Sequence, residues 1–254
     1  MTYTSESGHW YDAEGNPRYT ILGANGRERP TTIRDARKLG YVPSVTTIIK
    51  CAAAPGLENW KIDQALLSAL TLPRKEGESL DDFMTRAKQD SREQTRKAAE
   101  AGTALHGSLE KGFRGGSVAT EHQGHWEAVL QALALNGLPT AYDPEKSFCS
   151  TLGYGGKVDL HCPGYVGDFK SKPSADIKSG KRFAYDEQAM QLAAYANGLG
   201  MPNAVLFNIY VGREYPIASI HVWEPSPVYF NQFTHLLRFW QAKNQMYPQI
   251  QNAA

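Results

Sequence analysis

Two aspartates flank a Pro-Gly dipeptide in the segment GYGGKVDLHCPGYVGDFKSK. If Pro163-Gly164 forms the turn of an antiparallel hairpin, Asp159 lies opposite Asp168, with about 5 Å between their Cβ atoms. Lys170 follows Asp168 by two residues, so its side chain points to the same face of the strand. This spacing predicts two carboxylates and one ammonium group on a single patch. A slip of one residue in the register would send one aspartate to the opposite face.

Carboxylates that approach one another repel, so such a patch needs a cation or a proton to hold it together. A hard cation such as Mg²⁺ takes one or two carboxylates and leaves its remaining positions to water and phosphate oxygens. A lysine beside it supplies a compact positive charge for a phosphate or for attacking water. The glycines at positions 155, 156, 164 and 167 would let a ligand or a backbone approach closely. The patch favours metal-assisted phosphoryl chemistry over the alternative of a surface hairpin with solvated charges.

Helical patterns occupy the middle and the end of the chain. Ser44 and Ser79 are typical N-cap residues, and each precedes a segment that we expect to be helical. Gly102 and Gly107 are expected to bend or interrupt the long helix that follows Ser79. The predicted helices cover residues 45–52, 56–70, 80–112, 122–137, 183–200 and 228–246.

Between and beyond these helices, β-branched and alternating segments predict strands over residues 145–151, 154–162, 165–171, 204–212 and 215–223. The order of helices, antiparallel meander, helix and further strands predicts an α/β or α+β fold, with helices around a central mixed sheet. We expect a single domain over residues 1–254. It comprises an N-terminal arm of short strands and loops (1–43), a helical part (44–137), and the sheet core with the last helix (138–254).

The composition is ordinary for a soluble globular protein, with 41% hydrophobic and 21% charged residues. No apolar run approaches the roughly 18 residues of a membrane helix, and the N-terminus lacks the pattern of a secretory signal. Three cysteines without CxxC spacing argue against a thiolate metal site and predict a reducing intracellular compartment, such as the cytoplasm. The net charge of +1 neither favours nor excludes a nucleic-acid partner.

The motif Gly156-x-x-Asp159, followed by Asp168-x-Lys170, resembles the signature of the PD-(D/E)XK nucleases. In that superfamily an aspartate and an Asp/Glu-x-Lys motif lie on adjacent strands. The resemblance therefore implies a restriction-endonuclease-like core around the hairpin.

Two further motifs narrow the resemblance to the RecB-type branch. GTALHGSLE, which contains His106, is similar to the metal-ligand histidine motif of that branch, and QLAAY, from Gln191 to Tyr195, is similar to its Gln-x₃-Tyr motif. With VPSVTTIIK near the start, the layout resembles mitochondrial genome-maintenance exonucleases and phage exonucleases. The motifs span residues 42–211, and the resemblance leaves out the N-terminal arm and the last helix.

The resemblance also implies roles for individual residues. The catalytic residues would be Asp159, Asp168 and Lys170, and Mg²⁺, for which Mn²⁺ would substitute, would be held by His106, Asp159, Asp168 and the carbonyl of Phe169. Lys170 would orient the attacking water, and the products would carry a 5′-phosphate. Supporting or DNA-binding roles would fall to Glu110, Gln191, Tyr195 and Lys172.

The expected function is that of a metal-dependent exonuclease on single-stranded or end-containing DNA, in DNA processing, repair or recombination. The helices between residues 44 and 137 could form an arch through which a single strand threads. Two alternatives stay open. One is a structure-specific or restriction-like endonuclease, and the other is an inactive nucleic-acid-binding module with the same fold.

Overall fold

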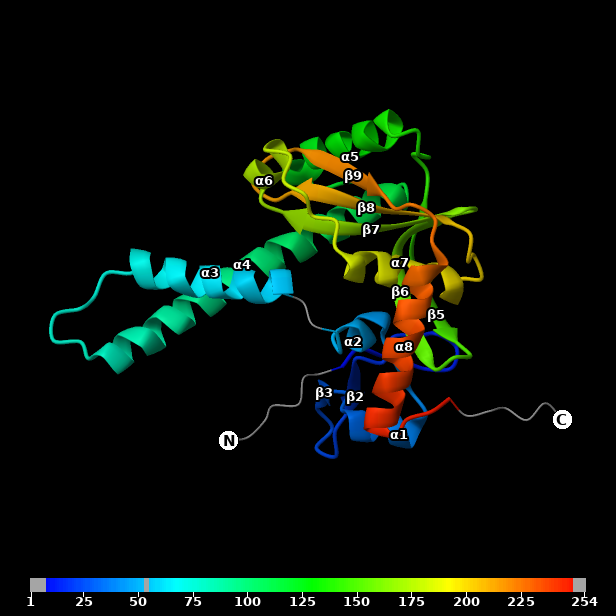
Figure 1. Cartoon of the computed structure of the whole chain (residues 1–254), viewed down its shortest axis with the longest axis horizontal. Helices are drawn as coiled ribbons and strands as arrows, with labels where there is room; N and C mark the ends of the chain where they lie inside the picture. The colour runs from blue at the N-terminus through cyan, green and yellow to red at the C-terminus, as the bar shows by residue number, and fades with distance from the viewer. Residues whose placement is uncertain (1–7, 53–54, 249–254) are drawn as a thin grey trace.

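A five-stranded mixed sheet forms the centre of the molecule, in the order β5-β6-β7-β8-β9 (Figure 1). The computed structural model describes residues 8–52 and 55–248. The strands of this sheet are β5 (Asp143–Ser150), β6 (Tyr154–Cys162), β7 (Tyr165–Lys172), β8 (Val205–Gly212) and β9 (Ala218–Val222). Helices pack against both faces, which confirms the predicted α/β architecture with a central mixed sheet.

The β6–β7 hairpin has the predicted register. Cys162 pairs with Tyr165 across the turn, and the ladder continues to the pair Leu160–Gly167. Gly164 has a φ angle of 82°, a left-handed value that the third position of a type II turn requires. Proline is favoured at the position before it, so the Pro-Gly dipeptide fixes the register of the hairpin.

β7 is the central strand of the sheet, and the pairing changes from antiparallel to parallel at this strand. β5, β6 and β7 are antiparallel neighbours, whereas β7 and β8 are parallel. The parallel pair is joined through α6 (Ser174–Lys178) and α7 (Asp186–Gly198), and β9 is antiparallel to β8. The sequence did not predict α6, because five residues are too few to show a helical apolar pattern.

The N-terminal arm contains a helix, α1 (Ile33–Leu39), besides the predicted strands β1 (Trp10–Tyr11), β2 (Thr20–Leu22), β3 (Glu28–Pro30) and β4 (Val42–Pro43). A capping box between Thr32 and Asp35 stabilises α1, and Gly40 ends it in the left-handed conformation. Seven residues of mostly polar sequence show too little periodicity to predict this helix.

The predicted serine caps are present at α2 (Val45–Ile49) and α4 (Leu80–Phe113), where Ser44 and Ser79 accept hydrogen bonds from backbone N–H groups. Of the predicted bend or interruption in α4, the interruption is wrong, because the helix continues through Gly102 and Gly107. A glycine costs a helix only about 1 kcal/mol, which the neighbouring turns of a long helix can offset.

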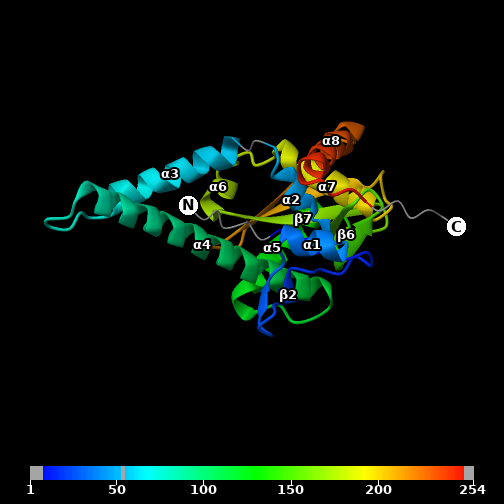
Figure 2. The ribbon, with the colours of Figure 1, turned by 90° about the horizontal axis from the view of Figure 1, so that it is seen from below.

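α3 (Pro55–Thr71) and the first half of α4 form a hairpin that projects from the body (Figures 1 and 2). The second half of α4 returns to the sheet and contacts β5 and β7. α5 (Gln123–Leu135), preceded by the short 3₁₀ helix η1 (Thr120–His122), packs on β8 and β9. Among the described helices, none combines the length and the apolar character that a bilayer crossing requires.

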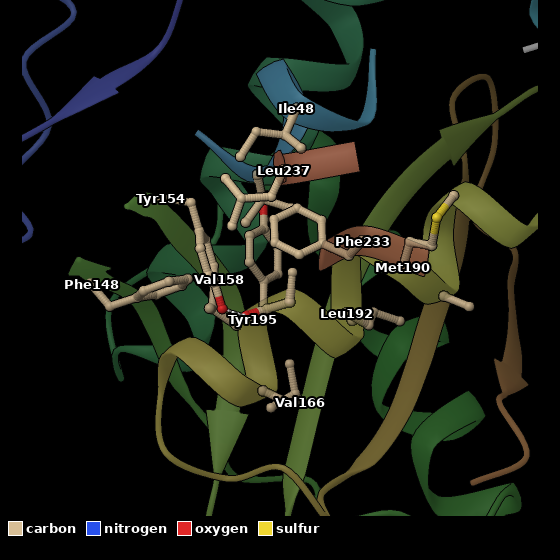
Figure 3. Packing of buried hydrophobic residues seen from close by; sticks show 14 of the residues in the cluster. Ile48, Phe148, Tyr154, Val158, Val166, Met190, Leu192, Tyr195, Phe233 and Leu237 are labelled. Atoms are coloured by element: carbon tan, nitrogen blue, oxygen red, sulfur yellow. Dashed lines mark hydrogen bonds between the residues drawn. The ribbon is translucent and has the colours of Figure 1, made fainter. Parts of the chain in front are cut away.

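Two apolar cores lie on opposite faces of the sheet. Helices α2, α7 and α8 (Pro227–Asn244) pack on one face around Tyr154, Leu192 and Phe233, which are fully buried (Figure 3). On the other face, α4 and α5 pack on β7 and β8 around Leu109 and Phe207. The two cores hold α4 and α7 against the same segment of β7 from opposite sides.

Gly198 provides a stability test with an unusual sign. Replacing a helical glycine by alanine usually stabilises a helix by up to about 1 kcal/mol. At Gly198, however, a Cβ atom would lie 2.0 Å from the buried Phe148 ring, whereas a Cβ on Gly107 in α4 meets no atom within 4 Å. We expect Gly198→Ala to lower the free energy of unfolding by about 1–3 kcal/mol and Gly107→Ala to raise it. Urea denaturation of both variants would check this, and equal signs would contradict it.

Candidate metal centre

β6 and β7 part immediately beyond the last pair of their ladder. Pairing ends at Leu160–Gly167, and the next residues are Asp159 on β6 and Asp168 on β7. Instead of a continued ladder, Oδ2 of Asp159 accepts a hydrogen bond from the N–H of Phe169 at 2.9 Å. A side-chain carboxylate thus takes the place of a backbone acceptor, at the point where the strands separate.

Helix α4 brings two further metal-ligand side chains to this point. His106 and Glu110 are one helical turn apart, so their side chains share one face. Nε2 of His106 lies 3.3 Å from Oε1 of Glu110 and 3.2 Å from Oδ2 of Asp159. One ligand atom from each residue lies within 4.8 Å of the others, so His106, Glu110 and Asp159 could hold a metal ion. We call these three residues the triad.

The residues of the triad fit a divalent cation. Nε2 of His106 is buried, and neither carboxylate contact has hydrogen-bond geometry, so the atom has no hydrogen-bond partner among the described residues. Adjacent ligands of an octahedral ion, bound at about 2.1 Å, are about 3.0 Å apart. The two carboxylate oxygens lie at nearly that separation from Nε2. The Phe169 ring, edge-on at 5.3 Å, holds the imidazole in this orientation.

The charges of the triad also favour a cation. Burial raises the pKa of Glu110 to about 7, with a further increase from Glu145 and an opposing effect from His106. Burial disfavours the charged form of His106, but Asp159 and Glu110 more than offset it, so the pKa of His106 lies above its ordinary value. A positive ion between these groups would favour ionised carboxylates and a neutral imidazole.

Asp168 lies beside the triad but takes part in a different set of contacts. Its buried carboxylate accepts hydrogen bonds from Gln191 at Oδ1 and from Asn208 at Oδ2, each at 3.1 Å. The ammonium of Lys170 lies 2.6 Å from Oδ2. Burial raises the pKa of Asp168 to about 6, with Lys170 opposing this and Asp159 adding to it. The two aspartates therefore interact electrostatically, although Asp168 is outside the cluster formed by the triad.

Gln191 and Tyr195 on α7 hold this second set together. Gln191 donates from Nε2 to Asp168 and to the hydroxyl of Tyr195, and its Oε1 accepts from Lys170 at 3.0 Å. One amide thus fixes both the carboxylate and the ammonium of the Asp-x-Lys motif. Tyr195 is buried, and its ring lies 6.2 Å from that of Phe148. Its hydroxyl group therefore gives the amide of Gln191 a fixed partner.

The glycines around the hairpin do not serve the purpose that the sequence suggested. Instead of leaving room for a ligand, three of them make room for aromatic side chains of the protein itself. An added Cβ atom would lie 2.3–2.8 Å from a ring atom, which belongs to Tyr11 at Gly155, to Tyr195 at Gly156 and to Phe207 at Gly167. The fourth, Gly164, serves the turn. The rings on both faces of the hairpin fit only because these positions carry no side chain.

Lys172, the remaining predicted residue, lies at the end of β7. Its Nζ is 5.1 Å from the centroid of the Phe183 ring, a cation–π contact. It lines a cavity shared with His106 and Lys170, so it belongs to the neighbourhood of the site but not to the triad.

Asn208 is a part of the site that the sequence analysis missed. It is fully buried in β8, directly beside Asp168 in the parallel ladder, and its Oδ1 accepts a hydrogen bond from Nε1 of Trp223 at 2.8 Å. A relay of fixed dipoles thus runs from Trp223 through Asn208 to Asp168. The available signal was one amide inside the apolar strand VLFNIYVG.

Replacing Asn208 by alanine should reveal the cost of breaking this relay. The change leaves the indole N–H of Trp223 without its acceptor and removes one of the donors to Oδ2 of Asp168, which keeps its ion pair with Lys170. We expect a loss of about 1–3 kcal/mol in unfolding free energy. Denaturation followed by tryptophan fluorescence would measure it. The control is Asn203→Ala in an exposed turn, which should change stability little. Equal stabilities of the two variants would contradict the relay.

Glu145 on β5 lies near the triad, and its charge is paired within the protein. Its side chain is 21% exposed and forms ion pairs with Arg114 and Lys157. The residue lies on β5 between Pro144, paired with Leu160, and the next paired residue, and it has a φ angle of 58°. Such a conformation is strained for glutamate and concentrates at functional sites. The sequence showed no sign of it, because strain depends on the neighbouring strand.

No protein-family model matches this chain, and no curated protein sequence matches it. Among the solved structures that match is one described as the crystal structure of LHK-Exo in complex with dAMP, with a TM-score of 0.30 and 13% sequence identity. The similarity covers 72% of this chain and 86% of that chain. At this level it supports no inference about function.

Proposed function

We propose that the protein is a Mg²⁺-dependent deoxyribonuclease, with Mn²⁺ able to substitute, and that it acts as an exonuclease on single-stranded or end-containing DNA. The observation that carries this proposal is one juxtaposition. The triad lies beside the Asp168–Lys170 pair, where β6 and β7 part. Acidic ligands for a hard cation and a fixed ammonium for a phosphate thereby meet at one point.

The proposed ligands of the cation are His106, Asp159, Asp168 and the main-chain carbonyl of Phe169, with Glu110 as an additional acid. In a strand, the carbonyl and N–H of one residue point to the same side. The carbonyl of Phe169 therefore faces the same edge of β7 as its N–H, which donates a hydrogen bond to Asp159. A divalent cation, when bound, polarises the phosphate and lowers the pKa of water.

Lys170 is the proposed catalytic ammonium. Two of its contacts are made within the protein, with Oδ2 of Asp168 and Oε1 of Gln191. An ammonium has three N–H donors, so one remains for a phosphate oxygen or for the attacking water. Because Asp168 and Gln191 fix its position, Lys170 needs little reorganisation to stabilise charge that develops on the phosphate.

The α3–α4 hairpin is the feature that favours a substrate with free ends. Its helix α4 carries His106 and Glu110 where it reaches the body, and the rest of the hairpin projects beside the sheet (Figure 2). We propose that a single strand passes between this hairpin and the sheet on its way to the site. A strand with a free end can enter such a passage, whereas a closed circle cannot.

Cleavage assays with labelled DNA test the proposal. Single- and double-stranded oligonucleotides, labelled at either end, are incubated with the protein in Mg²⁺ and compared with a closed single-stranded circle. We expect loss of the linear strands, 5′-phosphate products and an intact circle. Cutting of the circle would establish the endonuclease alternative. If no DNA is cleaved in Mg²⁺ or Mn²⁺ and calorimetry detects no Mn²⁺ binding, the alternative of an inactive nucleic-acid-binding module is supported.

A further inference from the structure

A cavity of about 290 Å³ extends from the triad along the edge of β7. One wall is the face of α4 that carries Gly102, Thr103 and His106, and the other is formed by Lys170 to Lys172 on β7. Gly102 brings the walls close together, since a Cβ atom on it would lie 2.6 Å from Oγ of Ser171. The cavity is thus a narrow continuation of the proposed metal site.

The edge of β7 that faces this cavity has no partner strand in the described residues. The ladder with β6 ends at Gly167, whereas the ladder with β8 on the other side continues to Lys172. Beyond Gly167, the N–H of Phe169 is bound by Asp159. The N–H of Ser171 points to the same side, because alternate residues of a strand share an orientation. A donor is therefore available at the cavity wall.

Lys172 is the basic group of this cavity that lacks an acidic partner. Lys170 is paired with Asp168, and the nearby Lys181 is paired with Asp176. Lys172 has no ion pair or side-chain hydrogen bond to any residue that the structure describes, and its Nζ lies over the Phe183 ring. Burial lowers the pKa of Lys172, and repulsion by Lys170, Arg213 and Lys181 adds to this effect, whereas Glu187 opposes it. A half-buried ammonium surrounded mainly by like charges attracts an anion strongly.

The spacing of the two lysines indicates which anion. Lys170 and Lys172 point to the same face, and two residues of a strand span roughly 6.6 Å. This is close to the length of one nucleotide unit of an extended strand. We propose that Lys172, with the cavity beside it, binds the phosphate next to the one that is cleaved, so that the strand lies along the free edge of β7. This inference rests on the proposed nuclease function and names the part of the substrate that the site grips.

The test measures binding without catalysis. A fluorescein-labelled single-stranded decamer is titrated in EDTA, at several salt concentrations, with wild type, Lys172→Met, Lys172→Arg and Lys38→Met. Methionine keeps the aliphatic stem over Phe183, and Lys38 is an exposed lysine of α1, outside the cavity. We expect Lys172→Met to bind about tenfold more weakly. Its slope of log K against log salt should be smaller in magnitude by about 0.7.

The remaining variants and substrates decide the outcome. Lys172→Arg and Lys38→Met should bind within about threefold of wild type. If Lys172→Met keeps wild-type affinity and slope, or if Lys172→Arg loses as much as Lys172→Met, the assignment is wrong. Decamers with a phosphate or a hydroxyl at each end distinguish two sources of the phosphate. A terminal phosphate would give wild type an end preference that Lys172→Met loses, whereas an internal diester would give the same loss for every decamer.

These outcomes are separable from those of the nuclease proposal. A protein that binds the decamer through Lys172 but cleaves no DNA in Mg²⁺ would support this subsite and refute the nuclease function. A nuclease whose Lys172→Met variant binds normally would do the reverse.

Discussion

Replacing Asp159 by asparagine is expected to reduce Mg²⁺-dependent DNA cleavage at least about a thousandfold and to abolish Mn²⁺ binding. A metal centre supplies several kcal/mol of transition-state stabilisation, and each 1.36 kcal/mol is a factor of ten in rate. Asp159 is the one residue of the triad on the central hairpin, and its carboxylate lies 3.2 Å from the imidazole of His106. Loss of its charge therefore removes the charged ligand that the hairpin contributes to the triad, opposite the ligands from α4.

Asparagine is chosen because it retains what Asp159 does for the fold. Its side-chain carbonyl can still accept the hydrogen bond from the N–H of Phe169, so the separation of β6 and β7 should persist. The matched control is Asp143→Asn, an exposed acid on the adjacent strand β5. Initial rates on a labelled oligonucleotide and isothermal calorimetry with Mn²⁺ provide the two measurements. An Asp159→Asn variant with wild-type turnover would refute the proposed centre.

The largest expected effect on stability comes from Phe233. Truncation to alanine should lower the free energy of unfolding by about 3–5 kcal/mol, the range for a buried phenylalanine. Phe233 is fully buried, and its ring lies 4.8 Å from Tyr154 and 6.2 Å from Phe230. Figure 3 shows it between Ile48 and Leu192, in the core that joins α2, α7 and α8 to the sheet.

The same helix offers a matched control. Phe239 of α8 is 55% exposed, so Phe239→Ala should change stability by less than about 1 kcal/mol. Guanidinium denaturation of both variants would compare them at equal composition. If Phe233→Ala were no less stable than Phe239→Ala, the packing of α8 against β6 would be wrong. Because Phe233 lies outside the site, the folded fraction of the variant should retain its cleavage rate.

Local rules were enough to predict the hairpin. A Pro-Gly turn and the two-residue period of a strand fixed the register, so that Asp159 and Asp168 were expected at the same level of adjacent strands. The caps at Ser44 and Ser79 and the long helices were predictable for the same reason, since their signals lie within a few residues. Where that signal was shorter, as in α1 and α6, the prediction failed.

The composition of the site was decided by tertiary structure. Asp159 and Asp168 were expected to grip a common ion, and Asp168 remains a proposed ligand. Its carboxylate also accepts hydrogen bonds from Gln191 and Asn208, which are 23 and 40 residues away along the chain. Glu110 also lies beside His106 and Asp159, because α4 packs this face against the separating strands. The sequence specifies which groups a strand or helix presents, over distances that a turn or a helical period spans. The partners of each carboxylate depend on the parallel pairing of β7 with β8 and on the packing of α4 and α7 against the two cores. Both features arise only when distant segments of the chain pack together.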